Sequence, residues 1–215
     1  MHNLIKVLVL PLFFISFISS NDIYEDNAFG VVLLMGDAGF GSGVIISSKG
    51  YILTNNHVVE NNENLKAILH YQYNLDGYEE YEHLIEIIKQ DKVKDLALIK
   101  IIKPRTSLRP IKISRKVPAI GSQVHAIGHP DLEIWTYTTG YISQFRDEYE
   151  WSYKDDFEHI ANVYQTQTPI AEGNSGGPLL NNHGNLVGIN TFGDIENDFQ
   201  NFSITVDEII RFLIN

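Results

Sequence analysis

Cysteine is absent from this chain of 215 residues, so no disulfide bond can stabilise its fold. Basic residues are also scarce: 16 lysines and arginines stand against 27 aspartates and glutamates, which gives a net charge of −11. This excess of negative charge disfavours nucleic acids and anionic membrane surfaces as partners. With 44% hydrophobic and 20% charged residues, the chain has the composition of an ordinary globular protein whose stability must come from packing.

Long apolar runs are missing after the first twenty residues. The amino-terminal sequence MHNLIKVLVLPLFFISFISS combines an early lysine with an apolar run from Val7 to Ile18, and it ends in small serines. A run of about a dozen residues is short for a bilayer span but typical of a secretory signal peptide. We therefore expect residues 1–20 to be a signal peptide, and the mature protein to be secreted or periplasmic and free of the membrane.

Runs typical of β-strands dominate the rest of the sequence, separated by glycine, asparagine and proline. In the first half these runs are residues 30–35, 42–48, 51–55, 65–70, 83–88 and 96–102. In the second half they are residues 123–128, 135–143, 161–167, 177–181, 186–192 and 201–206. The last segment, DEIIRFLI at 207–214, places apolar side chains at helical spacing after an acidic start, which predicts a short closing helix.

The two groups of predicted strands are separated by residues 105–121, which are rich in proline and basic side chains. This arrangement predicts an all-β fold of two six-stranded antiparallel β-barrels with a short C-terminal helix. We expect residues 21–115 to form the amino-terminal barrel, and residues 116–215 to form the carboxy-terminal barrel and the closing helix.

A single serine stands among three glycines in EGNSGGPLLN, residues 172–181. Glycine is usually retained where φ must be positive or where another group must approach the backbone closely. Taken alone, the run is equally compatible with a tight turn. The absent side chains would also let a substrate carbonyl reach the NH groups of Gly173 and Ser175, which would then form an oxyanion hole.

Amide hydrolysis by a serine also needs an imidazole to take its proton and a buried carboxylate to fix the tautomer of that imidazole. His57 directly follows a predicted strand, where one ring nitrogen can face solvent and substrate. Asp95 opens the apolar run DLALIKI, and a carboxylate that enters a core needs a partner such as an imidazole NH. We therefore predict a catalytic site of His57, Asp95 and Ser175; Asp91, in a polar context, is the weaker candidate for the carboxylate.

In the order His, Asp, Ser, the motifs TNNHVV, DLALIKI and GNSGGPLL resemble those of the trypsin-like serine proteases, most closely the HtrA/Deg branch. Subtilisins and α/β-hydrolases arrange the same groups in other orders. The resemblance extends through GSGVIIS, HAIGHP, TTGYIS, VYQTQTPI, LVGINT and NFSI, and so covers nearly the whole chain after residue 20.

The resemblance implies an exported serine endopeptidase that cleaves polypeptides through an acyl-enzyme, with no cofactor or metal. His57 would be the general base, Asp95 would orient it, and Ser175 would be the nucleophile, with the NH groups of Gly173 and Ser175 as oxyanion donors. HtrA relatives often form trimers through amino-terminal segments, so the resemblance also admits a homotrimer through residues 22–29.

Specificity and regulation are where the sequence departs from the family pattern. Asn190 and Thr191 align with the substrate-binding segment that flanks the residue before the cleaved bond. Glu172 replaces a frequent proline, and Asn174 replaces the aspartate that binds a newly cut amino terminus in digestive relatives. Because Pro169 stands where an aspartate would favour basic residues, we expect cleavage after small or medium apolar residues. HtrA proteins usually continue into PDZ domains, whereas this sequence ends after the predicted helix.

A catalytically idle binding or chaperone-like module that keeps the protease fold is the alternative function. It is disfavoured by the sequence because idle relatives usually lose a member of the triad. His125 and His129 are four residues apart but lie in a predicted strand and turn, so we do not expect them to bind a metal. The other histidines outside the site are interpreted as surface or turn residues: His70, His83, His159 and His183.

Residues 145–160, FRDEYEWSYKDDFEHI, contain six acidic and two basic side chains together with aromatic residues. We interpret this stretch as a solvated loop between two strands. The alternative is a mobile loop at the rim of the active site, since the corresponding region of HtrA proteases senses substrate or neighbouring subunits.

Overall fold

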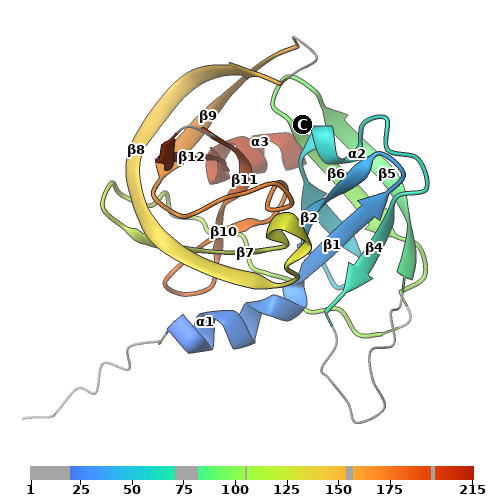
Figure 1. Cartoon of the computed structure of the whole chain (residues 1–215). Coiled ribbons are helices and arrows are strands. Elements are labelled where there is room, and N and C mark those ends of the chain that lie inside the picture. Colours follow the sequence, from blue (N-terminus) through green and yellow to red (C-terminus); the bar gives the residue numbers. More distant parts are fainter. Residues whose placement is uncertain (1–19, 71–81, 105, 154–156, 195–196) are drawn as a thin grey trace, which may run out of the picture.

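The computed structural model of the chain describes residues 20–70, 82–104, 106–153, 157–194 and 197–215. Its strands form two closed antiparallel barrels of six strands each, which lie side by side (Figure 1). The predicted signal peptide lies outside the described residues except for Ser20. Among the helices of the described residues, none has the length and apolar character needed to cross a bilayer.

The first barrel closes in the order β1-β2-β3-β6-β5-β4. Its strands are β1 (Val31–Gly36), β2 (Gly39–Ile45), β3 (Tyr51–Thr54), β4 (Lys66–Leu69), β5 (Glu82–Asp91) and β6 (Leu96–Ile101). Helix α1 (Ser20–Asn27), which the sequence patterns did not predict, leads through the 3-10 turn η1 (Ala28–Gly30) into β1. The short helix α2 (Asn56–Val59) follows β3.

The second barrel closes in the order β10-β11-β12-β9-β8-β7. Its strands are β7 (Gln123–Gly128), β8 (Thr136–Ser152), β9 (Glu158–Thr166), β10 (Pro178–Asn181), β11 (Leu186–Asp194) and β12 (Asn197–Thr205). The 3-10 turn η2 (Pro130–Leu132) joins β7 to β8, and helix α3 (Val206–Ile214) follows β12. The predicted double barrel with its short C-terminal helix is therefore confirmed, and the predicted division after residue 115 falls in the connection between β6 and β7.

Several strands of the first barrel are buried on both faces, because one face lines the barrel and the other packs against the second barrel. On β1, Val32 and Leu34 belong to the core of the first barrel, whereas Val31 belongs to the core shared with the second. On β3, Ile52 and Leu53 divide in the same way. Since successive side chains of a strand point to opposite faces, a continuous apolar run can fill both cores at once. This shared core fixes the two barrels relative to each other, and with them the residues at their facing ends.

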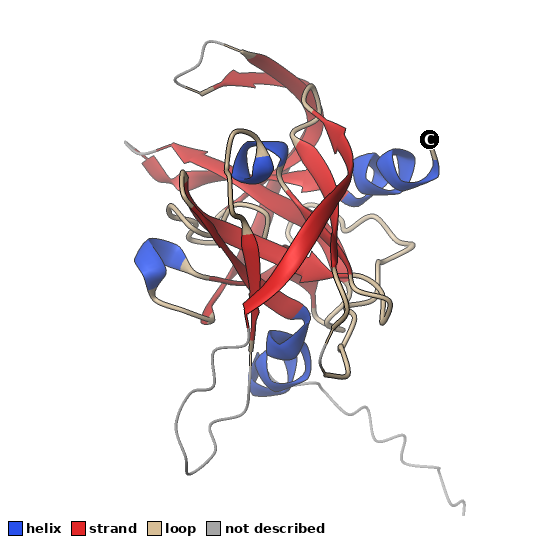
Figure 2. Ribbon diagram, turned by 90° about the vertical axis from the view of Figure 1, so that its right-hand side faces the viewer, coloured by secondary structure: helices blue, strands red, loops and turns tan. Residues whose placement is uncertain are grey.

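The interpretation of residues 145–160 as a loop was wrong for most of its length. Strands β8 and β9 pair with each other as far as Ser152 and Glu158 and form a long hairpin, whose paired strand ends lie at the top of the molecule (Figure 2). Along β8, Glu148 and Glu150 are exposed, while Tyr149 and Trp151 pack against phenylalanines of β11 and β12. Glu148 and Glu150 thus lie on the exposed face of the strand, and the number of acidic residues in this stretch obscured the period-two pattern.

Candidate active site

Asp95 and His57 form a tight pair at the junction of the two barrels. The Asp95 side chain is fully buried (0% exposed), whereas 29% of the His57 side chain is exposed. His57 Nδ1 lies 2.8 Å from Asp95 Oδ2, and the backbone NH of His57 donates to Asp95 Oδ1 at 2.9 Å. Because both carboxylate oxygens bind the same residue, the ring is held with Nδ1 towards the carboxylate and Nε2 is left for a second partner.

Neighbouring strands bring this pair together. His57 follows β3 and Asp95 precedes β6, and these strands pair in a register that sets Thr54 opposite Ala97. Asn55, in extended conformation before α2, donates through Nδ2 to the Asp95 carbonyl at 2.9 Å. Asp95 itself adopts a left-handed φ of 53° at the end of the turn between β5 and β6. This φ is uncommon for a residue other than glycine but relatively tolerated by aspartate.

Two hydroxyl groups complete the surroundings of the Asp95 carboxylate. Thr191 Oγ1 donates to Asp95 Oδ2 at 2.8 Å, and the Tyr153 hydroxyl donates to the same oxygen at 3.1 Å. Burial by itself would raise the pKa of the Asp95 carboxyl, but the charge of His57 and the hydrogen bonds from His57 and Thr191 outweigh it, so the pKa lies below its usual value. Asp95 is therefore held as a buried carboxylate anion that is paired and hydrogen-bonded.

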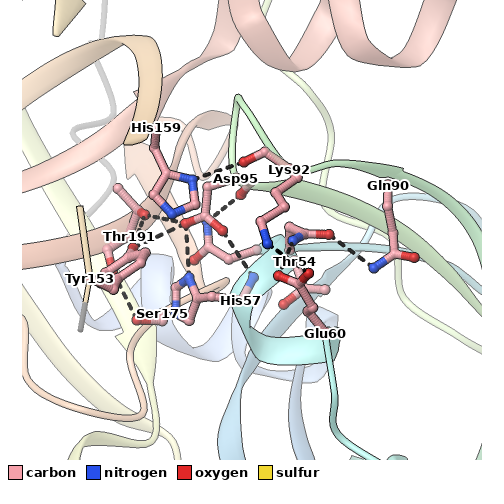
Figure 3. A network of polar contacts seen from close by, with 12 residues as sticks. Thr54, His57, Glu60, Gln90, Lys92, Asp95, Tyr153, His159, Ser175 and Thr191 are labelled. Atoms are coloured by element: carbon pink, nitrogen blue, oxygen red, sulfur yellow. Dashed lines mark hydrogen bonds and ion pairs between the residues drawn. The ribbon is translucent and has the colours of Figure 1, made fainter. Parts of the chain in front are cut away.

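Ser175 lies in the same network, as Figure 3 shows, but is not bonded to the imidazole. Its Oγ donates to the carbonyl of Thr191 at 2.9 Å. In the part of the chain that the structure describes, no hydrogen bond links Ser175 to His57. Thr191 thus connects the two halves of the site, because its hydroxyl binds Asp95 and its carbonyl binds Ser175.

The glycine-rich loop is clamped by Ser42 of β2 in the first barrel. The NH of Ser42 donates to the Ser175 carbonyl at 2.8 Å, and its Oγ donates to the Gly173 carbonyl at 2.7 Å. The carbonyl of Ser42 in turn accepts from Thr54 Oγ1 at 2.7 Å. Gly176, with φ of +83°, lies against these groups, and a Cβ there would come within 2.2 Å of both the Ser42 carbonyl oxygen and Thr54 Oγ1. The sequence therefore needs glycine at this position for the loop to approach β2.

Two backbone NH groups of the glycine-rich loop, those of Gly173 and Ser175, matter for the predicted oxyanion hole. The Glu172 carbonyl accepts from the NH of Asp131 in η2 at 2.8 Å. Because a trans peptide places its C=O and N–H on opposite sides, this bond turns the NH of Gly173 away from η2. Among the hydrogen bonds of the described residues, none is donated by the NH of Gly173 or of Ser175. Neither NH group is therefore committed to an acceptor in the described part of the chain, as the predicted oxyanion hole requires.

Asn190 and Thr191, which we predicted to be substrate-binding residues, both have buried side chains. Asn190 is fully buried, where Nδ2 donates to the Pro178 carbonyl at 3.2 Å and Oδ1 accepts from Ser203 Oγ at 2.9 Å. Its amide therefore joins β11 to the start of β10 and to β12. The Thr191 side chain is also buried, where its hydroxyl donates to Asp95, and its carbonyl accepts from Ser175 Oγ.

The histidines outside the site are mostly internal, which corrects the expectation of surface or turn positions for two of them. His83 and His159 are buried, and only His183 among the four is exposed in a turn. His125 is buried between the hydroxyl of Tyr137 and the amide of Asn182. The described residues contain no group of three or more His, Cys, Asp or Glu side chains arranged to hold a metal ion.

Three residues of the site were not singled out by the sequence. Ser42 stands between two glycines in GSGVIIS, a glycine-rich context like that of Ser175, but the motif was used only for the resemblance. Asn55 gave no signal of its own besides its place before His57. Tyr153 lies in the acidic stretch interpreted as a loop, so no pattern connected it with Asp95.

Comparison with known proteins gives a consistent set of relatives. Residues 41–189 match the family described as trypsin-like peptidase domain. The chain is 36% identical over 173 residues to Protease Do-like 1, chloroplastic, of Arabidopsis thaliana, covering 80% of this chain and 37% of that protein. It is 37% identical over 153 residues to the periplasmic serine endoprotease DegP of Salmonella typhimurium, covering 70% of this chain and 29% of that protein.

Among solved structures, the serine endoprotease from Yersinia pestis superposes with a TM-score of 0.72 at 32% sequence identity. The superposition covers 91% of this chain and 65% of that one. The chain thus spans only about a third of the length of the curated relatives named above.

Proposed function

This chain belongs to the family of trypsin-like peptidases, with homologues among the HtrA/Deg serine proteases, and from that premise we propose that it is a serine endopeptidase that hydrolyses polypeptides through an acyl-enzyme on Ser175. His57 is the general base, Asp95 orients it, and the NH groups of Gly173 and Ser175 form the oxyanion hole. The observation that carries the proposal is the 2.8 Å contact between His57 Nδ1 and the buried carboxylate of Asp95, in one network with Ser175.

The reaction begins with a small movement of the serine. Ser175 Oγ turns from the Thr191 carbonyl to His57 Nε2 by rotation about χ1 between staggered positions, and such hydrogen bonds commonly tighten only when substrate is bound. Nε2 then takes the hydroxyl proton while Oγ forms a bond to the substrate carbonyl carbon. Asp95 remains ionised and stabilises the imidazolium that results.

The negative charge that develops on the substrate oxygen is placed against the NH groups of Gly173 and Ser175. His57 next gives its proton to the amide nitrogen as the C–N bond breaks, which releases the amine and leaves an ester on Ser175. A water molecule loses a proton to His57 and attacks this ester, and Ser175 regains its proton when the acid product leaves. Each oxyanion donor is expected to contribute about 10²- to 10³-fold to kcat.

We further propose that the protein acts after export, in the periplasm or outside the cell. The apolar amino-terminal sequence supports this proposal, and so does the likeness to a periplasmic endoprotease. Export is tested by sequencing the amino terminus of the mature protein, which we expect near residue 21. Assembly into a homotrimer stays a prediction, to be tested by light scattering of the purified protein.

A fluorophosphonate probe tests the nucleophile directly, because it reacts only with a serine whose hydroxyl is activated. We expect the probe to label the protein, mass spectrometry of peptides to place the label on Ser175, and fluorescein-labelled casein to be cleaved. Ser175→Ala should abolish labelling and lower casein hydrolysis by several orders of magnitude while the thermal unfolding temperature is retained.

The same experiment separates the proposal from an idle binding module. A folded wild-type protein that neither reacts with the probe nor cleaves casein would contradict the enzymatic function and favour the binding module. A labelled protein that cleaves esters but no polypeptide would instead indicate an esterase with the same nucleophile.

A further inference from the structure

The β8–β9 hairpin of the second barrel binds the turn of the first barrel that carries Asp95. The NH of Ile160 donates to the Val93 carbonyl at 2.9 Å, and His159 Nδ1 lies 2.8 Å from the Lys92 carbonyl. Because a carbonyl only accepts, His159 Nδ1 carries the proton of this bond. The ammonium of Lys92 also lies 4.4 Å from the ring centroid of Phe157. Two of these contacts are hydrogen bonds to backbone carbonyls, so the hairpin fixes the backbone of the turn.

Tyr153, the residue directly after β8, extends these contacts into the catalytic site. Its hydroxyl lies 3.1 Å from Asp95 Oδ2 and 3.0 Å from Thr191 Oγ1. Its ring lies beside the imidazole of His57, with 4.7 Å between the ring centroids (Figure 3). One side chain thus contacts the carboxylate, the imidazole and the residue that holds Ser175.

The hydroxyl of Tyr153 is a neutral donor at every pH at which the enzyme would work. Burial, and after it the negative charge of Asp95, raise the pKa of the Tyr153 hydroxyl well above its usual value of 10. The charged and titratable groups that face Asp95 are His57 on α2 and Tyr153 from the hairpin, and His159 contacts the Tyr153 ring from β9.

Building on the proposed function, we propose that Tyr153 is a positioning residue for the Asp95–His57 pair: its hydroxyl fixes Oδ2 of Asp95, its ring supports the imidazole, and the β8–β9 hairpin thereby sets the alignment of the catalytic base. The hydroxyl also takes up part of the carboxylate charge. Its loss leaves more of that charge to attract a protonated imidazole, so the base becomes active only at higher pH.

Tyr153→Phe tests this role, because it removes the hydroxyl and keeps the ring. We expect the plateau rate of fluorophosphonate inactivation to fall by about 3- to 10-fold, since Asp95 keeps the donors of His57 and Thr191. We also expect the acidic limb of the pH–rate profile to move to higher pH. For casein, kcat should fall and KM should stay unchanged, because Tyr153 acts through Asp95 and His57.

Tyr149→Phe is the matched control, because Tyr149 lies on the same hairpin with its ring stacked on Phe192 and Phe202. This control should keep the wild-type rate and pH profile. The positioning role is overturned if Tyr153→Phe keeps the wild-type rate and acidic limb, or if it loses rate only in proportion to unfolded protein with the limb unmoved. A wild-type protein that fails to react with the probe would contradict the proposed function itself, and the role of Tyr153 with it.

Discussion

Gly173 is the position where a single methyl group should separate catalysis from folding most clearly. Its φ is +98°, and a Cβ built there lies 2.2 Å from the carbonyl oxygen of His129 and 2.5 Å from Cε2 of Phe40. The His129 carbonyl is held by the NH of Leu132 at 3.2 Å, so it cannot yield easily. In Gly173→Ala the peptide must therefore rotate, and the NH that we propose as an oxyanion donor would turn away. Loss of one such donor costs about 10²- to 10³-fold in kcat, or about 3–4 kcal/mol of transition-state stabilisation.

The backbone strain of this substitution can be measured separately. Gly121 has a similar φ of +82°, but a Cβ there meets nothing within 4 Å. We expect Gly121→Ala to lose about 1–2 kcal/mol of unfolding free energy, the cost of a left-handed residue, and to keep the wild-type kcat. Gly173→Ala should lose at least as much stability and, in addition, 10²- to 10³-fold in kcat for casein hydrolysis under conditions where it is folded. The reasoning is refuted if folded Gly173→Ala hydrolyses casein with a kcat within about threefold of that of Gly121→Ala.

Two further predictions concern the buried ionisable groups. Asp95→Asn would place an amide NH₂ or a neutral oxygen against His57 Nδ1 and so favour the wrong tautomer; we expect kcat to fall by about 10⁴-fold with the fold retained, measured as casein hydrolysis and as thermal unfolding. His129 is fully buried, and burial lowers the pKa of its imidazole to about 4. Because the unfolded chain binds this proton near pH 6.5 and the folded one only near pH 4, stability is full above pH 6.5 and falls as the pH drops towards 4. His129→Asn keeps an acceptor for the NH of Trp135. Between about pH 7.5 and 4.5, the free energy of unfolding of this variant, measured in urea, should fall by on the order of 3 kcal/mol less than that of the wild type. An unchanged pH dependence would contradict this prediction.

The double barrel was predictable because its strands are marked by local patterns. Each predicted apolar run overlaps an observed strand, since turns of glycine, asparagine and proline bound short runs that fill a core. The run DLALIKI placed a carboxylate at the head of a core strand, and the structure puts Asp95 there, fully buried.

What the sequence could not supply were contacts between distant segments. The burial of the Asn190 side chain, whose amide joins β11 to neighbouring strands, is one such case. The hydrogen bond from Ser42 to the Gly173 carbonyl joins residues that are 131 positions apart, and only the packing of one barrel on the other brings them together. The loop prediction for the acidic hairpin failed for a different reason: charged side chains on the exposed face of β8 hid the pattern of the aromatic face that carries Trp151.

The central claim is that Ser175 and His57 act as one unit although they come from different barrels. Its most direct test is kcat for casein hydrolysis in Ser175→Ala, His57→Ala and the double variant, each checked for folding. If the two act together, each single substitution lowers kcat by about 10⁶-fold and the double variant is no slower than either. Independent effects that multiply in the double variant, or a His57→Ala protein with near wild-type kcat, would contradict it.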